Sequence, residues 1–293
     1  MEDALCGLPD GSGYELAFYG GSFTAIPAAK QEELLKAAQP AFARGAVSAL
    51  RVSTRPDAVD PRTLERLHRC HVQTVELGAQ SMDNRVLACA GRGHTAEQTR
   101  QAAGLIKASG FQLILQMMTG LPGSDEESDI ATAREIVKLR PDGVRIYPTV
   151  VVKDTPLEEM WRAGQYREHT VEDAVGLCAR ILPMFETAGI PVIRLGLNPT
   201  QELSGGAAVA GAYHPALGEL VRSRILRSRA EELLSETPHG KEVRFYAPPR
   251  LLSAAIGQHR DNLTYLQRKF GLERIEVFPE EGEELRLADA AEK

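Results

Sequence analysis

Five short segments of this chain place glycines and polar side chains directly after apolar runs that resemble strands. Glycines allow backbone amides to approach a ligand closely, an arginine can clamp a carboxylate, and a glutamine can bond a hydroxyl. In an α/β barrel the active site lies at the C-terminal ends of the strands. The five segments therefore predict one ligand site, and they are residues 20–23, 53–57, 78–81, 91–94 and 117–122.

Each segment also has a purely structural explanation when it is taken singly. Gly20 and Gly21 could form a tight turn between a strand and a helix, and Arg55 could pair with its neighbour Asp57. His94 is better explained as the start of a helix than as a metal ligand, because no second metal-binding residue stands at a matching spacing. The order and spacing of the whole series favour the ligand site over these alternatives.

The elements that would position these residues alternate along the first two thirds of the chain. Repeated strand–helix units predict parallel strands joined by right-handed crossovers. A doubly wound sheet and a complete or partial (βα) barrel both fit this pattern. We expect strands at 14–19, 49–53, 74–77, 112–117, 143–152 and 191–197, and helices at 28–42, 62–70, 95–110, 125–139 and 171–188.

After residue 198 the composition changes, and we predict a linker with an arginine-rich helix over 199–240. A small α/β unit follows over 241–279. The acidic tail, 280–293, is too charged to bury much surface and is expected to be disordered. Residues 1–198 would form the partial barrel.

Composition restricts the classes of protein that remain. The chain has 293 residues, a net charge of −6 and 43% hydrophobic residues, which is typical of a soluble globular protein and does not predict binding to a polyanion. No apolar run is long enough to span a membrane, no signal peptide is evident, and we expect a cytoplasmic protein. The four cysteines lack CxxC spacing, so they predict neither a metal site nor disulfides; they are Cys6, Cys70, Cys89 and Cys178.

Taken together, the segments resemble the radical S-adenosylmethionine (SAM) superfamily, in particular the radical domain of the Elongator catalytic subunit. That family reads as a glycine pair followed by Thr-Phe, then Glu-Thr-Arg-Pro-Asp, Gly-Val-Gln-Ser, Arg-Arg-Gly-His and Met-Met-Pro-Gly-Leu-Pro. The resemblance covers about half of the chain and continues through Asp129 and residues 146–149, 155–157 and 164–166. It implies a partial TIM-type (βα) barrel of the radical SAM kind.

The resemblance implies that Gly20, Gly21 and Ser22 meet the methionyl amino group of SAM. The acidic residue of the second segment often binds the cofactor in such families, and Ser53 occupies that position here. Arg55, two residues later, could clamp a carboxylate.

The oxygen-independent coproporphyrinogen oxidases share the spacing between a glutamine and an arginine. The resemblance to them implies that Gln80 and Arg92 contact the ribose and the carboxylate of SAM. Gln116 stands where those enzymes usually have an aspartate.

The family also holds a [4Fe–4S] cluster with a cysteine triplet upstream of the glycine pair, and this sequence has only Cys6 there. We expect a truncated chain that lacks the cluster loop and the first strand. The full-length protein would take an electron from a donor such as flavodoxin or ferredoxin and cleave SAM to a 5′-deoxyadenosyl radical, acting on an unknown substrate for which RNA is the first candidate. The alternative is an inactive barrel that binds RNA or protein. The acetyltransferase domain of the Elongator subunit has no counterpart here.

The C-terminal unit resembles a K-homology (KH) module, in which a Gly-x-x-Gly loop between two helices clamps a nucleotide backbone. Gly257 begins the corresponding segment, His259 lies within it, and Arg260 replaces the second glycine. These three residues are the predicted RNA contacts. A small cap that closes the barrel is the alternative.

Overall fold

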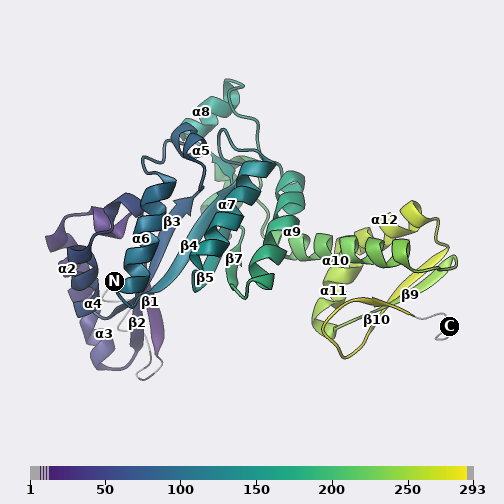
Figure 1. Ribbon diagram of the computed structural model, residues 1–293, viewed down its shortest axis with the longest axis horizontal. Helices are drawn as coiled ribbons and strands as arrows, with labels where there is room; N and C mark the ends of the chain where they lie inside the picture. The colour runs from purple at the N-terminus through teal and green to yellow at the C-terminus, as the bar shows by residue number, and fades with distance from the viewer. Residues whose placement is uncertain (1–6, 8, 10, 12, 289–293) are drawn as a thin grey trace. The chain divides into compact units, whose positions relative to one another are not determined.

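The computed structural model describes residues 7, 9, 11 and 13–288, so Cys6 lies outside the described residues (Figure 1). The chain forms two compact units. The first comprises residues 1–149 and 184–195, and the second comprises residues 150–183 and 196–293. This grouping differs from the four predicted segments, because the chain returns to the first unit for its last strand.

A six-stranded sheet is the framework of the first unit. Every neighbouring pair of strands is parallel. Neighbours in the sheet follow the chain order, whereas a doubly wound sheet reverses that order part-way through. The architecture is therefore the partial barrel. The strands, in sheet order, are β1 (Tyr14–Phe18), β2 (Val47–Thr54), β3 (Val72–Gln80), β4 (Gln112–Thr119), β5 (Gly143–Pro148) and β7 (Val192–Leu195).

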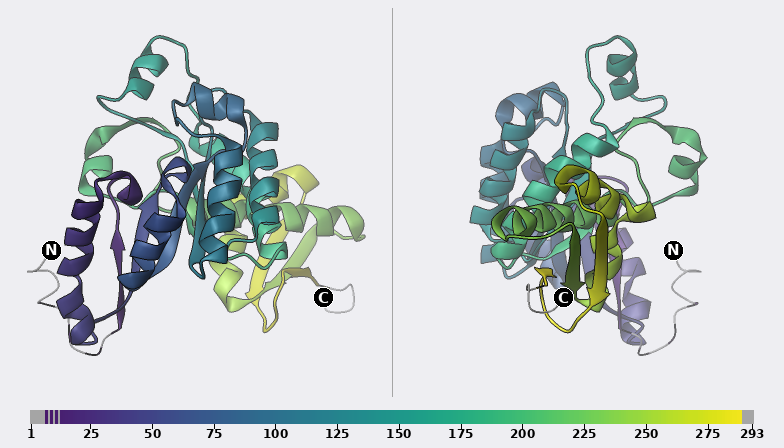
Figure 2. Two further views of the ribbon diagram at one scale, coloured as in Figure 1. Left: turned by 60° about the vertical axis from the view of Figure 1, so that its left-hand side comes forward. Right: turned by 90° about the vertical axis from the view of Figure 1, so that its right-hand side faces the viewer.

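Helices cover one face of this sheet, as Figures 1 and 2 show for α6 and α7. Successive side chains of a strand point to opposite faces. In β4, Leu113 and Leu115 are fully buried, whereas Gln112 and Gln116 alternate with them on the opposite face. The apolar residues therefore face the helices and polar residues line the inner face. The helices are η1 (Phe23–Ala25), α2 (Ala28–Ala37), α3 (Gln39–Ala43), η2 (Pro56–Ala58), α4 (Pro61–Arg69), α5 (Asn84–Cys89), α6 (Ala96–Ala108) and α7 (Glu126–Leu139).

Local sequence explains where several helices begin. The side chain of Asp60 accepts hydrogen bonds from the first turn of α4, and Thr95 forms a capping box with Gln98 at the start of α6. The single helix predicted for 28–42 is two helices. Pro40 lies in the first turn of α3, where its missing N–H is tolerated but a continuous helix is not.

The predicted strand 143–152 is also two strands, separated at Thr149. The second, β6 (Val150–Val152), pairs antiparallel with β8 (Ala208–Gly211) instead of continuing in the large sheet. The second unit therefore contains a strand, and the π-helical turn η3 (Leu203–Ala207), in the stretch predicted to be a linker. Helix α8 (Pro156–Arg162) and most of α9 (Val171–Thr187) also belong to it.

The rest of the second unit is built on a three-stranded sheet of order β10-β9-β11. Helix α10 (Leu217–Glu236) contributes Ala230 and Leu234 to the core that contains Phe245 and Leu263, so the predicted arginine-rich helix packs on this sheet. The remaining elements are β9 (Glu242–Ala247), η4 (Pro249–Leu251), α11 (Leu252–Ile256), η5 (Gln258–Arg260), α12 (Asp261–Phe270), β10 (Arg274–Pro279) and β11 (Arg286–Leu287).

The structure describes residues 280–288 of the acidic tail, and the prediction of disorder was wrong for these residues. Leu285 is buried in the core of the three-stranded sheet, and β11 pairs antiparallel with β9. Glu280 forms an ion pair with Arg286, which offsets part of the negative charge. One apolar side chain and a short strand thus suffice to hold a segment that its charge alone would predict to be free.

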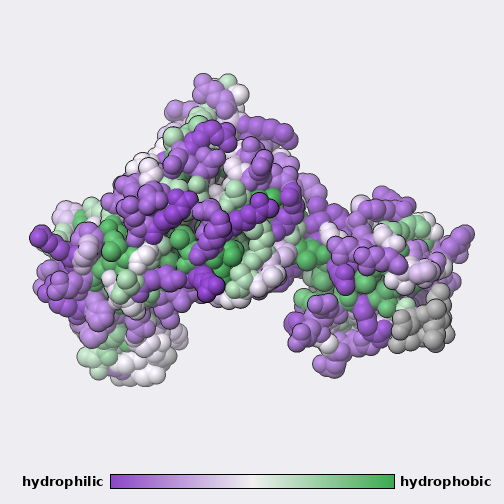
Figure 3. Space-filling model, in the orientation of Figure 1, coloured by the Kyte–Doolittle hydropathy of each residue, from purple (hydrophilic) through white to green (hydrophobic). Residues whose placement is uncertain are grey.

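The visible surface is mainly hydrophilic, with smaller apolar patches between the charged side chains (Figure 3). Within the described part of the chain, no helix has both the length and the apolar character needed to cross a membrane.

Candidate functional site

The glycine pair follows β1 directly and leaves open space in front of its backbone. Gly20 has φ +104° and Gly21 has φ +157°, which side chains rarely permit. A Cβ atom added at either glycine would meet no atom within 4 Å. The pair therefore has the conformation and the room for backbone groups to meet a ligand.

Arg92 lies in the loop between α5 and α6 and extends to β4. Its guanidinium donates to the sulfur of Met118 over 2.8 Å, while its buried Nε has no hydrogen-bond partner. Burial lowers the pKa of this guanidinium, which still remains a cation at neutral pH. Arg92 is thus a half-buried positive charge with spare donors, the kind of group that an anionic ligand would satisfy.

Gln80, the last residue of β3, meets Gln116, which lies in the C-terminal half of β4. The Gln116 Nε2 donates to the Gln80 Oε1 over 3.4 Å, close to the limit for a hydrogen bond. Gln80 has φ +62° and stands at a shift in the β3–β4 register. A Cβ at Gly78 would lie 2.7 Å from the Gln80 amide nitrogen, so that glycine makes room for the glutamine side chain.

Arg55 is already engaged on both sides. Its Nε donates to Asp57, which is the pairing that the structural explanation of this residue predicted. Its terminal nitrogen Nη2 donates to the backbone oxygen of Arg92 over 3.1 Å. The second contact joins the end of β2 to the Arg92 loop. Arg55 therefore anchors the backbone of Arg92. Because two of its guanidinium nitrogens already donate hydrogen bonds within the protein, Arg55 has fewer donors left for a ligand than Arg92 has.

The structure thus links Arg55, Arg92, Gln80 and Gln116 to β2, β3 and β4, all at the C-terminal edge of the sheet. Ser53 lies opposite Glu76 in the β2–β3 register. The ring nitrogen Nε2 of His94 lies 3.1 Å from the backbone oxygen of Ala79, and His94 directly precedes Thr95, the residue that caps α6.

Comparison with protein-family models identifies this framework. The model of the radical SAM superfamily matches residues 7–136, and the model of the radical SAM C-terminal domain matches residues 141–227. The two matches are adjacent and account for most of the chain. This chain belongs to the radical SAM superfamily. The resemblance inferred from the strand-end segments is therefore confirmed.

The curated relatives of this radical SAM chain include Elongator proteins. It is 38% identical over 130 residues to the tRNA uridine(34) acetyltransferase of Methanocaldococcus jannaschii, covering 43% of this chain and 24% of the relative. It is 32% identical over 177 residues to Elongator complex protein 3 of Homo sapiens, covering 59% of this chain and 31% of the relative. The chain spans only a quarter to a third of the length of these proteins.

Solved structures confirm the partial barrel. Elp3 of Methanocaldococcus infernus, with an N-terminal deletion, matches with a TM-score of 0.64 and 28% identity over 73% of this chain and 54% of that chain. The coproporphyrinogen III oxidase of Escherichia coli, a radical SAM enzyme, matches in fold with a TM-score of 0.51 and 16% identity over 60% of this chain and 40% of that chain.

The described residues do not fit an iron–sulfur cluster. Three thiolates in one place are needed to hold a [4Fe–4S] cluster with an open iron site. Within the part of the chain that the structure covers, no three His, Cys, Asp or Glu side chains come together as a metal site. Cys70, Cys89 and Cys178 form no disulfide bond among the described residues.

SAM itself fits the described residues better. The glycine pair leaves space in front of its backbone, and the orphaned donor of Arg92 lies at the same edge of the same sheet. Whether Gly20, Ser22, Ser53 or the two glutamines contact SAM stays a prediction.

Sequence reasoning missed a polar network on the inner face of the radical SAM half-barrel. It consists of Tyr19, Glu76, Arg145 and Tyr147, which come from the end of β1, from β3 and from β5. Two signals point to it in retrospect. Glu76 is the only charge in the run 72–80, and Tyr19 directly precedes the glycine pair.

The KH-like segment lies between α11 and α12, as a β-α-α-β unit requires. Gly257 has φ +80°, and His259 and Arg260 have φ +51° and +64°. Arg260 thus adopts the left-handed conformation for which a glycine would be favoured. Asn262 holds the segment, because its amide donates to backbone oxygens of Ala254 and Ser223 over 3.0 Å.

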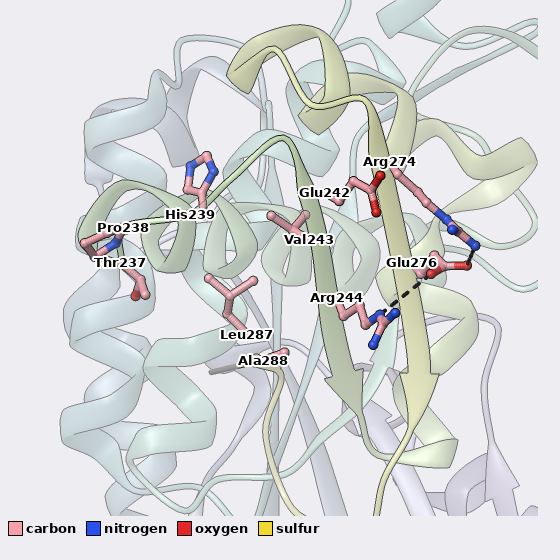
Figure 4. Close-up of a pocket in the computed structure, with 10 residues that line it drawn as sticks. All are labelled: Thr237, Pro238, His239, Glu242, Val243, Arg244, Arg274, Glu276, Leu287 and Ala288. Carbon is pink, nitrogen blue, oxygen red and sulfur yellow. Dashed lines mark hydrogen bonds and ion pairs between the residues drawn. The ribbon is translucent and has the colours of Figure 1, made fainter. Parts of the chain in front are cut away.

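A cavity of about 490 Å³ lies in the same unit, at the start of β9 and β10 (Figure 4). Arg244 and Arg274 line it, but both point to Glu276, which pairs with Arg274 over 2.8 Å and with Arg244 over 4.0 Å. The carboxylate offsets the positive charge, so the cavity does not by itself indicate an anionic ligand. The KH-like segment does not line it.

Proposed function

We propose that this chain binds SAM at the C-terminal edge of its half-barrel and forms part of an Elongator-related radical SAM enzyme. The observation that carries the proposal is Arg92, a half-buried guanidinium with an orphaned Nε and a thioether as its hydrogen-bond partner. A buried polar group without a partner costs about 1–3 kcal/mol, and a carboxylate would remove that cost. Arg92 therefore suits the methionyl carboxylate of SAM.

The roles of the other residues follow from their positions. The backbone of Gly20 and Gly21 meets the methionyl amino group, and the amides of Gln80 and Gln116 bind the ribose hydroxyls. The chemistry expected of SAM in this superfamily, release of a 5′-deoxyadenosyl radical, would need an electron from a cluster that the described residues do not hold. The residues of this chain bind and orient the cofactor. The thiolates for the cluster, and an electron donor such as flavodoxin or ferredoxin, come from outside the described residues.

We propose RNA as the substrate class. We also propose that the protein is located in the cytoplasm. The proposal draws on the names of the relatives, which include a tRNA uridine(34) acetyltransferase. These names describe longer proteins, so they suggest a substrate class and not a reaction for this chain. The absence of a three-thiolate site among the described residues favours a second candidate function, a barrel that binds RNA without radical chemistry.

Calorimetric titration of the purified chain with SAM tests the proposal. We expect saturable binding that Gly20→Ala weakens by about tenfold, because a Cβ would occupy the space in front of the backbone. The matched control is Gly164→Ala, another glycine with positive φ (+69°) and an open Cβ position, which should leave binding unchanged. Absence of SAM binding to the unaltered chain, or equal affinities of both variants, contradicts the proposed site.

A further inference from the structure

Tyr19 and Arg145 touch across the inner face of the sheet although four strand intervals separate β1 from β5. An Arg145 guanidinium nitrogen donates to the Tyr19 phenol oxygen over 2.9 Å. Neighbouring strands lie about 4.8 Å apart, so a flat sheet would separate these strands by about 19 Å. Side chains stand roughly perpendicular to a sheet and could not meet across that distance. The contact therefore requires a strongly curled sheet, and it connects the end of β1 to β5 across the inner face of that sheet.

Glu76, on β3, accepts hydrogen bonds from both Tyr19 and Arg145. Its side chain is 1% exposed, it accepts from the Tyr19 phenol over 3.0 Å, and Arg145 Nε donates to it over 3.1 Å. Arg51 on β2 lies 3.8 Å away as a second cation. A buried carboxylate is costly unless it is paired, so the network holds its members in one arrangement.

Tyr19 is the member next to the cofactor site, because Gly20 follows it in the chain. Strand β1 is at the edge of the described sheet and pairs only with β2. Its C-terminal end is held by the ladder to β2, by the packing of Phe18 on the buried Phe23, and by the phenol of Tyr19, of which only the phenol reaches β3 and β5. Without the phenol, the end of β1 could move relative to β3 and β4, which carry Gln80 and Gln116.

We propose that Tyr19 is a positioning residue: through Glu76 and Arg145 it sets the distance between the Gly20–Gly21 backbone and the strands on the other side of the cofactor site. The inference rests on the proposed binding of SAM. The phenol itself touches no ligand in this role. The two halves of the site, one on β1 and one on β3 and β4, would bind SAM together only at the spacing that the network maintains.

The test compares Tyr19→Phe with Tyr147→Phe. Both substitutions remove one phenol oxygen that contacts Arg145, but Tyr147 stands on β5, the same strand as Arg145 (its oxygen lies 3.3 Å from Arg145). We expect Tyr19→Phe to speed amide hydrogen exchange in residues 14–21 and to weaken SAM binding by about tenfold. Tyr147→Phe should match the unaltered chain in both measurements. Tyr19 is half exposed (55%), so the variant should fold.

The two readouts separate the two proposals. If the unaltered chain does not bind SAM, the proposed function fails, and hydrogen exchange still tests the link through Tyr19. Equal exchange in residues 14–21 for both variants overturns the inference, even if SAM binds. Faster exchange with unchanged SAM affinity also overturns it, because the network would then stabilise β1 without positioning the site.

Discussion

The guanidinium of Arg92 lies 2.8 Å from the sulfur of Met118, and among the described residues no carboxylate pairs with it. A thioether is a weak acceptor for a cation. The guanidinium of Arg92, in the loop between α5 and α6, is therefore a positive charge that no carboxylate of the described residues neutralises. That relationship separates Arg92 from Arg55, which pairs with Asp57.

Arg92→Gln should weaken SAM binding by at least about tenfold while leaving the thermal midpoint unchanged or slightly raised. The substitution removes a charge that the fold leaves unpaired, so the folded chain loses little and the carboxylate of SAM loses its partner. Titration calorimetry and thermal unfolding measure the two effects. Arg85→Gln is the control, because Arg85 is exposed and lies 3.6 Å from Asp83. A large loss of stability with unchanged SAM affinity would assign Arg92 to the fold instead of the site.

Asp129 predicts a dependence of stability on pH. Burial raises the pKa of its carboxyl to about 7, while Gly120 N–H donates to one oxygen and the other has no partner. The raised pKa means that the folded chain holds a proton that the unfolded chain releases near pH 4. The stability due to this proton is present below pH 4 and is lost as the pH rises toward 7, by about 4 kcal/mol at most.

Asp129→Asn should remove that loss. Urea unfolding of the variant and of the unaltered chain should agree near pH 4, and the variant should become the more stable of the two as the pH approaches 8. Asp125→Asn is the control with the opposite sign, because hydrogen bonds from Ser128 lower the pKa of the Asp125 carboxyl. Parallel pH curves for Asp129→Asn and the unaltered chain would show that folding does not raise the pKa of the Asp129 carboxyl.

Two glycine-to-alanine substitutions should change stability in opposite directions. At Gly257, with φ +80°, a Cβ would lie 2.9 Å from the Asn262 backbone nitrogen, so alanine should cost more than about 1 kcal/mol. At Gly104, in the middle of α6, a Cβ meets nothing within 4 Å, and alanine should stabilise by about 0.5–1 kcal/mol. Denaturant midpoints measure both. Equal changes of the denaturant midpoint in the two variants would mean that the backbone between α11 and α12 accommodates the added Cβ of Gly257→Ala without a loss of stability.

Arg260→Glu tests the KH-like interpretation. Reversing the charge next to the predicted nucleotide clamp should weaken binding of a single-stranded oligoribonucleotide by at least about tenfold at low salt, and the difference should shrink as salt rises. Arg229→Glu makes the same change of charge on α10, at an exposed residue paired with Glu232, and should have a small effect. Fluorescence anisotropy measures both affinities. If the two variants lose the same affinity for the oligoribonucleotide, binding depends only on the overall charge of the protein, and the KH interpretation is wrong.

Local patterns were good predictors wherever the cause of a structure lay within a few residues. The predicted alternation of strands and helices depends on neighbours in the chain, and so do the starts of α4 and α6, which Asp60 and Thr95 cap. The predictions failed where a distant partner decided the outcome. Residues 150–152 left the large sheet to pair with β8, and Leu285 became ordered because a core was available to it.

The sequence by itself determined the superfamily and the strand ends that carry the candidate site, because short motifs in a set order record both. Only the tertiary structure decided which of those residues are satisfied: Arg55 has its ion pair, whereas Arg92 keeps an orphaned donor. It also revealed the link from Tyr19 to Arg145, 126 residues apart in the chain. Such contacts depend on the curl of the whole sheet, which no local pattern encodes.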